Sequence, residues 1–115
     1  MKAKPMRLVY GKGYFSSSIG DATHVKLNMP GPLPDRHIPV ILQGKRGGTG
    51  CWTWNGDTEK PTLRPSILTE GYTSDSNLHH RCHTWVNDGI AHFLDDTSHE
   101  FAGCHLELLD VEGVQ

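Results

Sequence analysis

Side chains suited to hydrolytic chemistry recur along this sequence. A hydrolytic site needs an activated nucleophile, a proton acceptor and groups that stabilise an oxyanion. The candidate proton acceptors are three histidines at predicted strand edges or turns, namely His37, His83 and His99. The candidate nucleophiles are hydroxyl and thiol side chains, namely Ser66, Thr84, Ser98 and Cys82.

Ser66 is the nucleophile that its surroundings favour most. It follows Pro65, which fixes the backbone before it and forces Arg64 out of the helical region. The apolar pair Ile67-Leu68 comes next, so the segment is predicted to be extended. Such a serine is held on stiff backbone at the end of a strand, as a positioned nucleophile must be. The same spacing also suits a serine that only terminates a strand, so the residues alone leave both interpretations open.

The same histidines also suit a metal site. Three histidines and a water form a catalytic zinc arrangement, in which the pKa of the bound water falls toward about 7. In such a metal-dependent hydrolase His37, His83 and His99 would be the ligands and zinc the cofactor. The chain has neither a Cys-x-x-Cys nor a His-Glu-x-x-His motif, so this alternative depends on the three histidines converging. Residues 79–83, His-His-Arg-Cys-His, add further candidate ligands, although such clusters are often solvated loops.

Short strands and tight turns must position these groups. The clearest hairpin joins Cys82–Val86 to Ile90–Leu94 through Asn87-Asp-Gly89, a connection that suits a type I turn with a bulge. His83 then shares one face of its strand with Trp85, and its neighbours Cys82 and Thr84 face the other way. Asp95 and Asp96 follow in a polar turn, where an aspartate could orient a histidine.

The rest of the chain shows the same pattern of short strands. The sequence has 13 glycines and 7 prolines, which favour turns over long helices. About seven strands are predicted, with residues 11–20 forming a loop. We therefore expect one all-β domain over residues 1–115. Its short, mostly antiparallel strands would form a small sandwich or an open barrel, with at most one or two short helical turns.

Charge and hydropathy exclude several classes of function. Lys plus Arg is 11 and Asp plus Glu is 13, so the net charge is −2 and a nucleic-acid binder that neutralises phosphates is not expected. No apolar run approaches the roughly 20 residues of a membrane span, and no signal peptide is evident. We expect a cytoplasmic protein of a bacterium or of a phage-infected cell. Eight histidines predict different behaviour near pH 6 and pH 8.

Much of the chain from about residue 24 onward resembles a small family of phage and bacterial proteins, some of them mislabelled as ammonia monooxygenases. Its signature is similar to the run Trp52-Thr-Trp-Asn-Gly-Asp-Thr-Glu-Lys-Pro-Thr-Leu-Arg-Pro-Ser-Ile-Leu68. The similarity continues through Cys82-His-Thr-Trp85, Asp88-Gly-Ile90, Asp96-Thr-Ser-His99 and Phe101-Ala-Gly103.

The resemblance implies a serine-type peptidase or isopeptidase. Relatives occur in bacterial operons for ubiquitin-like conjugation, where they act as deconjugating peptidases, so a protein substrate or a ubiquitin-like modifier is the implied partner. Ser66 would be the nucleophile, either His83 or His99 would be the base, and the other of these two histidines would orient it. Asp96 is the alternative orienting residue.

Two departures from the family pattern bear on these roles. Many members carry Cys-Pro-Gly-Cys followed by a histidine, whereas this chain has Met29-Pro-Gly-Pro32 followed by His37. A structural zinc that uses those cysteines should therefore be absent, which gives His37 a separate role. Members also commonly have serine where this chain has Thr84, which weakens a nucleophile at that position.

A third hypothesis involves no chemistry. A small, nearly neutral β domain also suits a phage-encoded binding or anti-defence protein that blocks a host factor. Its contact surface would then be the loop at residues 71–80 or the turn at residues 44–50. Neither the substrate nor the oligomeric state follows from the sequence.

Overall fold

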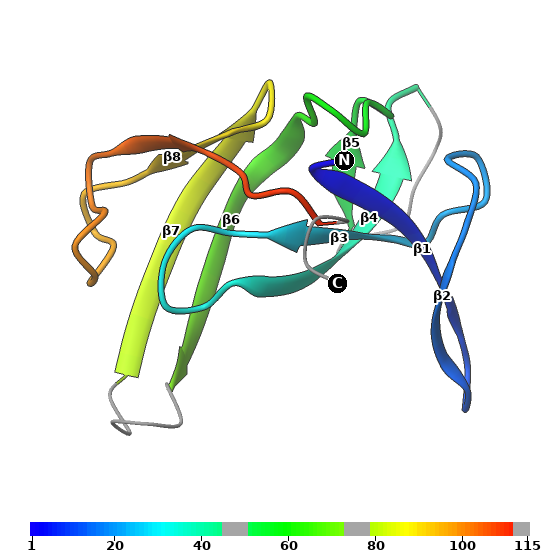
Figure 1. Cartoon of the computed structure of the whole chain (residues 1–115), viewed down its shortest axis with the longest axis horizontal. Coiled ribbons are helices and arrows are strands. Elements are labelled where there is room, and N and C mark those ends of the chain that lie inside the picture. The colour runs from blue at the N-terminus through cyan, green and yellow to red at the C-terminus, as the bar shows by residue number, and fades with distance from the viewer. Residues whose placement is uncertain (45–50, 73–78, 112–115) are drawn as a thin grey trace.

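The computed structural model describes residues 1–44, 51–72 and 79–111, which form one nine-stranded sheet (Figure 1). The strands are β1 (Ala3–Val9), β2 (Gly13–Ser16), β3 (His24–Asn28), β4 (Asp35–Leu42), β5 (Trp52–Trp54), β6 (Leu63–Tyr72), β7 (His79–Asn87), β8 (Ile90–Phe93) and β9 (His105–Glu107). These residues contain no helix, which confirms the all-β prediction. The described part of the chain accordingly holds no helix that could cross a membrane.

The strands follow one another almost in sequence order. Their order in the sheet is β2-β1-β3-β4-β5-β6-β7-β8-β9, and every pair is antiparallel except β4 and β5. After β9 the backbone N–H of Leu109 donates to the carbonyl of Asn28 at 2.9 Å. The sheet therefore bends until the segment after its last strand reaches β3, which corresponds to the open-barrel alternative.

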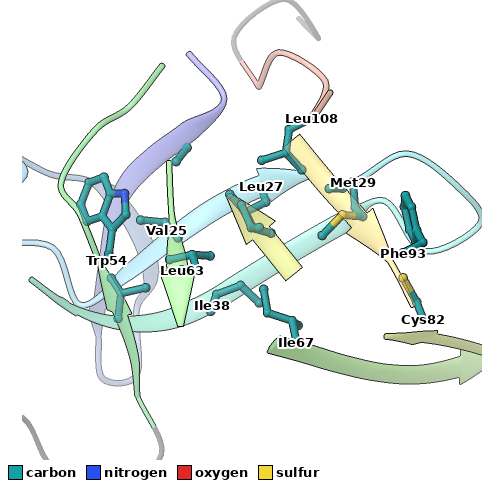
Figure 2. Close-up of a cluster of buried hydrophobic side chains, with 14 residues drawn as sticks. Val25, Leu27, Met29, Ile38, Trp54, Leu63, Ile67, Cys82, Phe93 and Leu108 are labelled. Atoms are coloured by element: carbon teal, nitrogen blue, oxygen red, sulfur yellow. The ribbon is translucent and has the colours of Figure 1, made fainter. Parts of the chain in front are cut away.

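The bent sheet encloses the hydrophobic core. Alternate residues point inward, because successive side chains of a strand lie on opposite faces. Val25, Leu27 and Met29 come from β3 and the residue just after it, and they belong to one buried cluster with Trp54 and Leu63 (Figure 2). Burial of this apolar surface is the main source of stability for the sheet.

The same alternation sends polar side chains of β7 outward. Cys82 and Thr84 are buried, whereas His83 and Trp85 are partly exposed. The predicted division of this strand into two faces is confirmed. The outer face of β6 and β7 is therefore the surface on which any chemistry involving His83 must occur.

Residues 11–20 were predicted as a loop, but they include β2. Gly11 and Gly13 have φ angles of 77° and 103°, and these left-handed conformations let the chain reverse at once after β1. The prediction was wrong here because Tyr14, Phe15 and Ser16 lack a clear alternation of apolar and polar residues. About seven strands were predicted, and the described residues form nine.

The turn between β7 and β8 is tighter than predicted. Asn87 pairs directly with Ile90, which leaves only Asp88 and Gly89 between the strands. Both have positive φ angles, 51° and 77°, as a type I′ turn requires. Asp-Gly is a preferred pair for this turn, so the three-residue connection was the wrong choice.

Candidate active site

Two adjacent strands bring a serine and a histidine together on the outer face of the sheet. Ser66 Oγ lies 2.9 Å from His83 Nε2. Ser66 belongs to β6 and His83 to β7, and the two strands pair along most of their length. The contact is a hydrogen bond between groups separated by 17 positions in the sequence.

An irregularity in β6 places Ser66 beside the histidine. The pairing with β7 shifts between Leu63 and Ile67, so that four residue steps on β6 correspond to two on β7. Pro65 lies inside this bulge, follows a cis peptide bond and has no N–H to donate to the ladder. The indole N–H of Trp52 donates to the Ser66 carbonyl at 3.2 Å, which fixes the backbone of the serine from the other side.

The turn after β8 supplies a carboxylate to the other ring nitrogen of His83. His83 Nδ1 lies 3.0 and 3.1 Å from the two carboxylate oxygens of Asp96. An ionised carboxylate only accepts hydrogen bonds, so Nδ1 must carry the proton that is donated to Asp96. Nε2 of the neutral ring is then the acceptor, and the Ser66 hydroxyl donates to it.

This arrangement has the chemistry of a serine nucleophile with its base. A hydroxyl that donates to a neutral imidazole can lose its proton to that ring as it attacks a carbonyl. The carboxylate behind the ring fixes its orientation and stabilises the imidazolium that forms. The order along the hydrogen bonds is Ser66, His83, Asp96.

The three groups are open to solvent. The side chain of His83 is 26% exposed and that of Asp96 is 44% exposed. A pocket of about 580 Å³ lies elsewhere, between Lys2, Lys60 and the β7–β8 turn. A molecule that reacts at Ser66 must therefore approach across the surface of the sheet.

A cation and an aromatic ring contact each other near the bulge of β6, two residues before Ser66 and two residues after His83. The guanidinium of Arg64 donates to the side chain of Asn87 at 2.7 Å and lies 5.3 Å from the centre of the Trp85 ring. These contacts hold the side chains of Arg64, Trp85 and Asn87 together next to the bulge. Their importance was not apparent from the sequence, because the hydrogen bonds of Arg64 span 22 and 23 positions.

The other candidate nucleophiles have different surroundings. Cys82 and Thr84 are buried, and their side chains lie 3.2 Å apart in a hydrogen bond with each other. The hydroxyl of Ser98 accepts the backbone N–H of Arg81 at 2.7 Å. None of these three is hydrogen-bonded to an imidazole in the described structure.

His99 does not join Ser66 and His83. Its Nδ1 accepts the backbone N–H of Phe101 at 3.3 Å, and its ring packs edge-on against Phe93 and Phe101. Burial, followed by the charges of His80 and Arg36, lowers its pKa. Asp96, the alternative in the sequence analysis, occupies the position expected for the orienting histidine.

The predicted zinc ligands His37, His83 and His99 do not converge. The ring of His37 stacks on Tyr14 with centroids 4.2 Å apart, while His83 lies between Ser66 and Asp96. Within residues 1–44, 51–72 and 79–111, no three His, Cys, Asp or Glu side chains gather as metal ligands. Each of the three rings has its own contacts on a separate part of the fold.

The remaining candidate residues have varied surroundings. Residues 79–83 belong to β7 and not to a loop, and His79 Nε2 lies 3.5 Å from Glu70. The surfaces of the binding hypothesis, at 44–50 and 71–80, fall largely on residues 45–50 and 73–78, which lie outside the described residues.

A family model matches more than half of the chain. The family of bacterial ubiquitination-like system serine proteases, BubE, matches residues 34–94, which is more than half of the chain. No curated protein and no solved structure matches it. The match includes Ser66 and His83 and ends two residues before Asp96. The chain belongs to this family.

Proposed function

We propose that this BubE family member is a serine hydrolase that cleaves amide bonds of protein substrates. Ser66 is the nucleophile, His83 the general base and Asp96 the residue that orients His83. The observation that carries the proposal is the pair of hydrogen bonds on His83, 2.9 Å to Ser66 and 3.0 Å to Asp96. The family match supports the class of reaction.

The positions of the protons on Ser66 and His83 determine the steps of the reaction. Ser66 Oγ attacks the carbonyl carbon while His83 Nε2 takes its proton, and the resulting imidazolium gives that proton to the leaving amine as the C–N bond breaks. Water then attacks the acyl-serine, loses a proton to His83 and releases the acid, and Ser66 recovers its proton from His83. Asp96 remains ionised throughout and keeps Nδ1 protonated.

The open site suits a polypeptide. A small substrate is usually enclosed by a pocket, whereas Ser66 and His83 lie on an exposed sheet face beside Trp85 and Arg64. The substrate that we propose is the amide or isopeptide bond between the C-terminus of a ubiquitin-like modifier and its target. The family description, a serine protease of a ubiquitination-like system, supports this choice.

A fusion substrate tests the proposal. A bacterial ubiquitin-like protein joined through its C-terminus to a reporter domain should be cleaved at the junction, and Ser66→Ala should abolish cleavage. Ser18→Ala, which removes an exposed hydroxyl that is bonded to Asp21, is the matched control and should leave cleavage unchanged. Cleavage by Ser66→Ala at the rate of the unmodified protein would disprove the role of Ser66. Tight binding without cleavage would favour a binding protein instead.

A further inference from the structure

The turn that carries Asp96 is hydrogen-bonded to β7 through its backbone. β8 ends at Phe93, which pairs with Thr84. Residues 79–83 of β7, which precede Thr84, therefore have no strand partner on that side. The N–H of Leu94 donates to the carbonyl of His83 at 2.8 Å, and the N–H of Ser98 donates to that of Arg81 at 2.8 Å. The turn thereby replaces the missing strand at two alternate residues of β7.

The side chain of Thr97 completes this replacement at His83. Its hydroxyl accepts the backbone N–H of His83 at 3.1 Å and donates to the carbonyl of the same residue at 3.1 Å. Thr97 is only 5% exposed, so this hydroxyl has exchanged water for the backbone of a single residue. When a hydrogen-bond partner of such a buried hydroxyl is removed, most of the stabilisation that these hydrogen bonds give the fold is lost.

Ser98 repeats the arrangement two residues earlier on β7. Its hydroxyl accepts the N–H of Arg81 at 2.7 Å and donates to the carbonyl of Arg81 at 3.4 Å. The guanidinium of Arg81 in turn lies 3.5 Å from Asp96. Asp96 therefore sits directly before two hydroxyl residues that hold its turn against the strand that carries His83.

We propose that Thr97 is a positioning residue that sets the hydrogen bond between Asp96 and His83, with Ser98 as its secondary support. The Thr97 hydroxyl is hydrogen-bonded to the backbone of His83 and not to its ring, so it acts through Asp96 and not on the substrate. Its effect on the orientation of the imidazole follows from structure alone, whereas its effect on rate rests on the proposed function. Because both residues share one turn, a shift of the Thr97 hydroxyl moves the carboxylate of Asp96 relative to Nδ1.

Two substitutions at Thr97 separate the hydroxyl from the volume of the side chain. Thr97→Val keeps the shape and removes both hydrogen bonds, whereas Thr97→Ser keeps the hydroxyl. The first readout is the NMR signal of the His83 Nδ1 proton, which a carboxylate acceptor moves far downfield and which His83→Gln assigns by its loss. The second is the rate of covalent labelling by a fluorophosphonate, a general probe of activated serines.

We expect Thr97→Val to lose the downfield signal and to be labelled about a hundredfold more slowly, because small misplacements of catalytic groups have effects of that size. Thr97→Ser should retain both the signal and the rate. A Thr97→Val protein that keeps the signal at its original position overturns the inference. If the unmodified protein is not labelled at all, the proposed function fails, and the NMR signal still decides the role of Thr97.

Ser98→Ala decides the matter if Thr97→Val does not fold. Ser98 is exposed, so its truncation leaves no cavity in the core. Loss of its bonds to Arg81 should broaden or shift the His83 signal and slow the labelling by about tenfold. An unchanged signal together with an unchanged rate in this variant would then overturn the proposal.

Discussion

At the scale of single residues, the proposed mechanism depends on the two ring nitrogens of His83. Asp96 is exposed, and its ion pair with Arg81 at 3.5 Å is a surface contact that adds little stability by itself. Its effect is on chemistry: it selects the tautomer of His83 that leaves Nε2 free to accept the proton of Ser66. In the proposed mechanism the carboxylate therefore matters more to the reaction than to the stability of the fold.

Replacing this carboxylate by an amide tests that distinction. An asparagine side chain can donate to Nδ1, which favours the wrong tautomer, so Asp96→Asn should slow serine labelling by about ten-thousandfold while the urea midpoint changes little. Asp95→Asn removes the same charge from the adjacent position and is the control. Equal rates for Asp96→Asn and the unmodified protein would remove Asp96 from the mechanism.

The sequence favoured Ser66 as the nucleophile, but it left His83 and His99 as alternative bases and did not decide the third partner. Pro65 marked the stiff segment, and alternation along β7 placed His83 on the outer face. Whether Asp96 or His99 reaches His83 depends on the turn after β8, whose hydrogen bonds join residues 14 positions apart. Spacing along the chain contains no information on such contacts.

At the scale of elements, β5 is short but holds the largest fully buried side chain among the described residues. Trp54 has no exposed surface, and its indole N–H donates to the Asp57 carbonyl at 3.2 Å. We expect Trp54→Ala to lower the free energy of unfolding by about 3–5 kcal/mol, measured by urea denaturation. Tyr10→Ala, at a fully exposed ring, should change it by less than about 0.5 kcal/mol. Similar losses for the two variants would contradict the assigned core.

The turn between β7 and β8 offers a second test at this scale. Gly89 has a φ of +77°, and a Cβ there would lie 3.1 Å from the carbonyl of Glu59. Gly89→Ala should therefore destabilise the protein by about 1–2 kcal/mol, because an L residue is strained in this conformation. Gly20→Ala, where a Cβ meets nothing within 4 Å, is the matched control. Thermal unfolding of the two variants measures the difference, and equal melting temperatures would count against the type I′ turn.

The elements themselves were predictable to different degrees. The core strands β3, β4 and β7 alternate clearly between buried and partly exposed residues. β2 lies almost entirely outside the core, so no apolar alternation marks it. Patterns of hydropathy report burial, and a strand formed mainly by backbone pairing at an edge of the sheet leaves little trace in them.

At the scale of the whole molecule, histidines couple stability to pH. Burial lowers the pKa of His24, His37, His92 and His99 below the ordinary value of 6.5, and neighbouring positive charges add to the effect. Below about pH 6.5 the unfolded chain therefore binds more protons than the folded one. The contribution of these histidines to stability is fully present above about pH 6.5 and is lost as the pH falls from there through their lowered pKa values in the folded protein.

Urea unfolding should accordingly give a higher free energy at about pH 8 than at about pH 5.5. His37→Gln should reduce the difference, because it removes one of the groups whose pKa burial lowers. Greater stability at the lower pH would mean that these rings gain partners on protonation, contrary to their surroundings in the structure.

The central claim is that His83 activates Ser66. Tandem mass spectrometry of the fluorophosphonate-treated protein, digested after labelling, locates the modified side chain directly. We predict a single adduct on Ser66 in the unmodified protein and none in His83→Gln. An adduct on another residue, or labelling of Ser66 to the same extent without His83, would contradict the account.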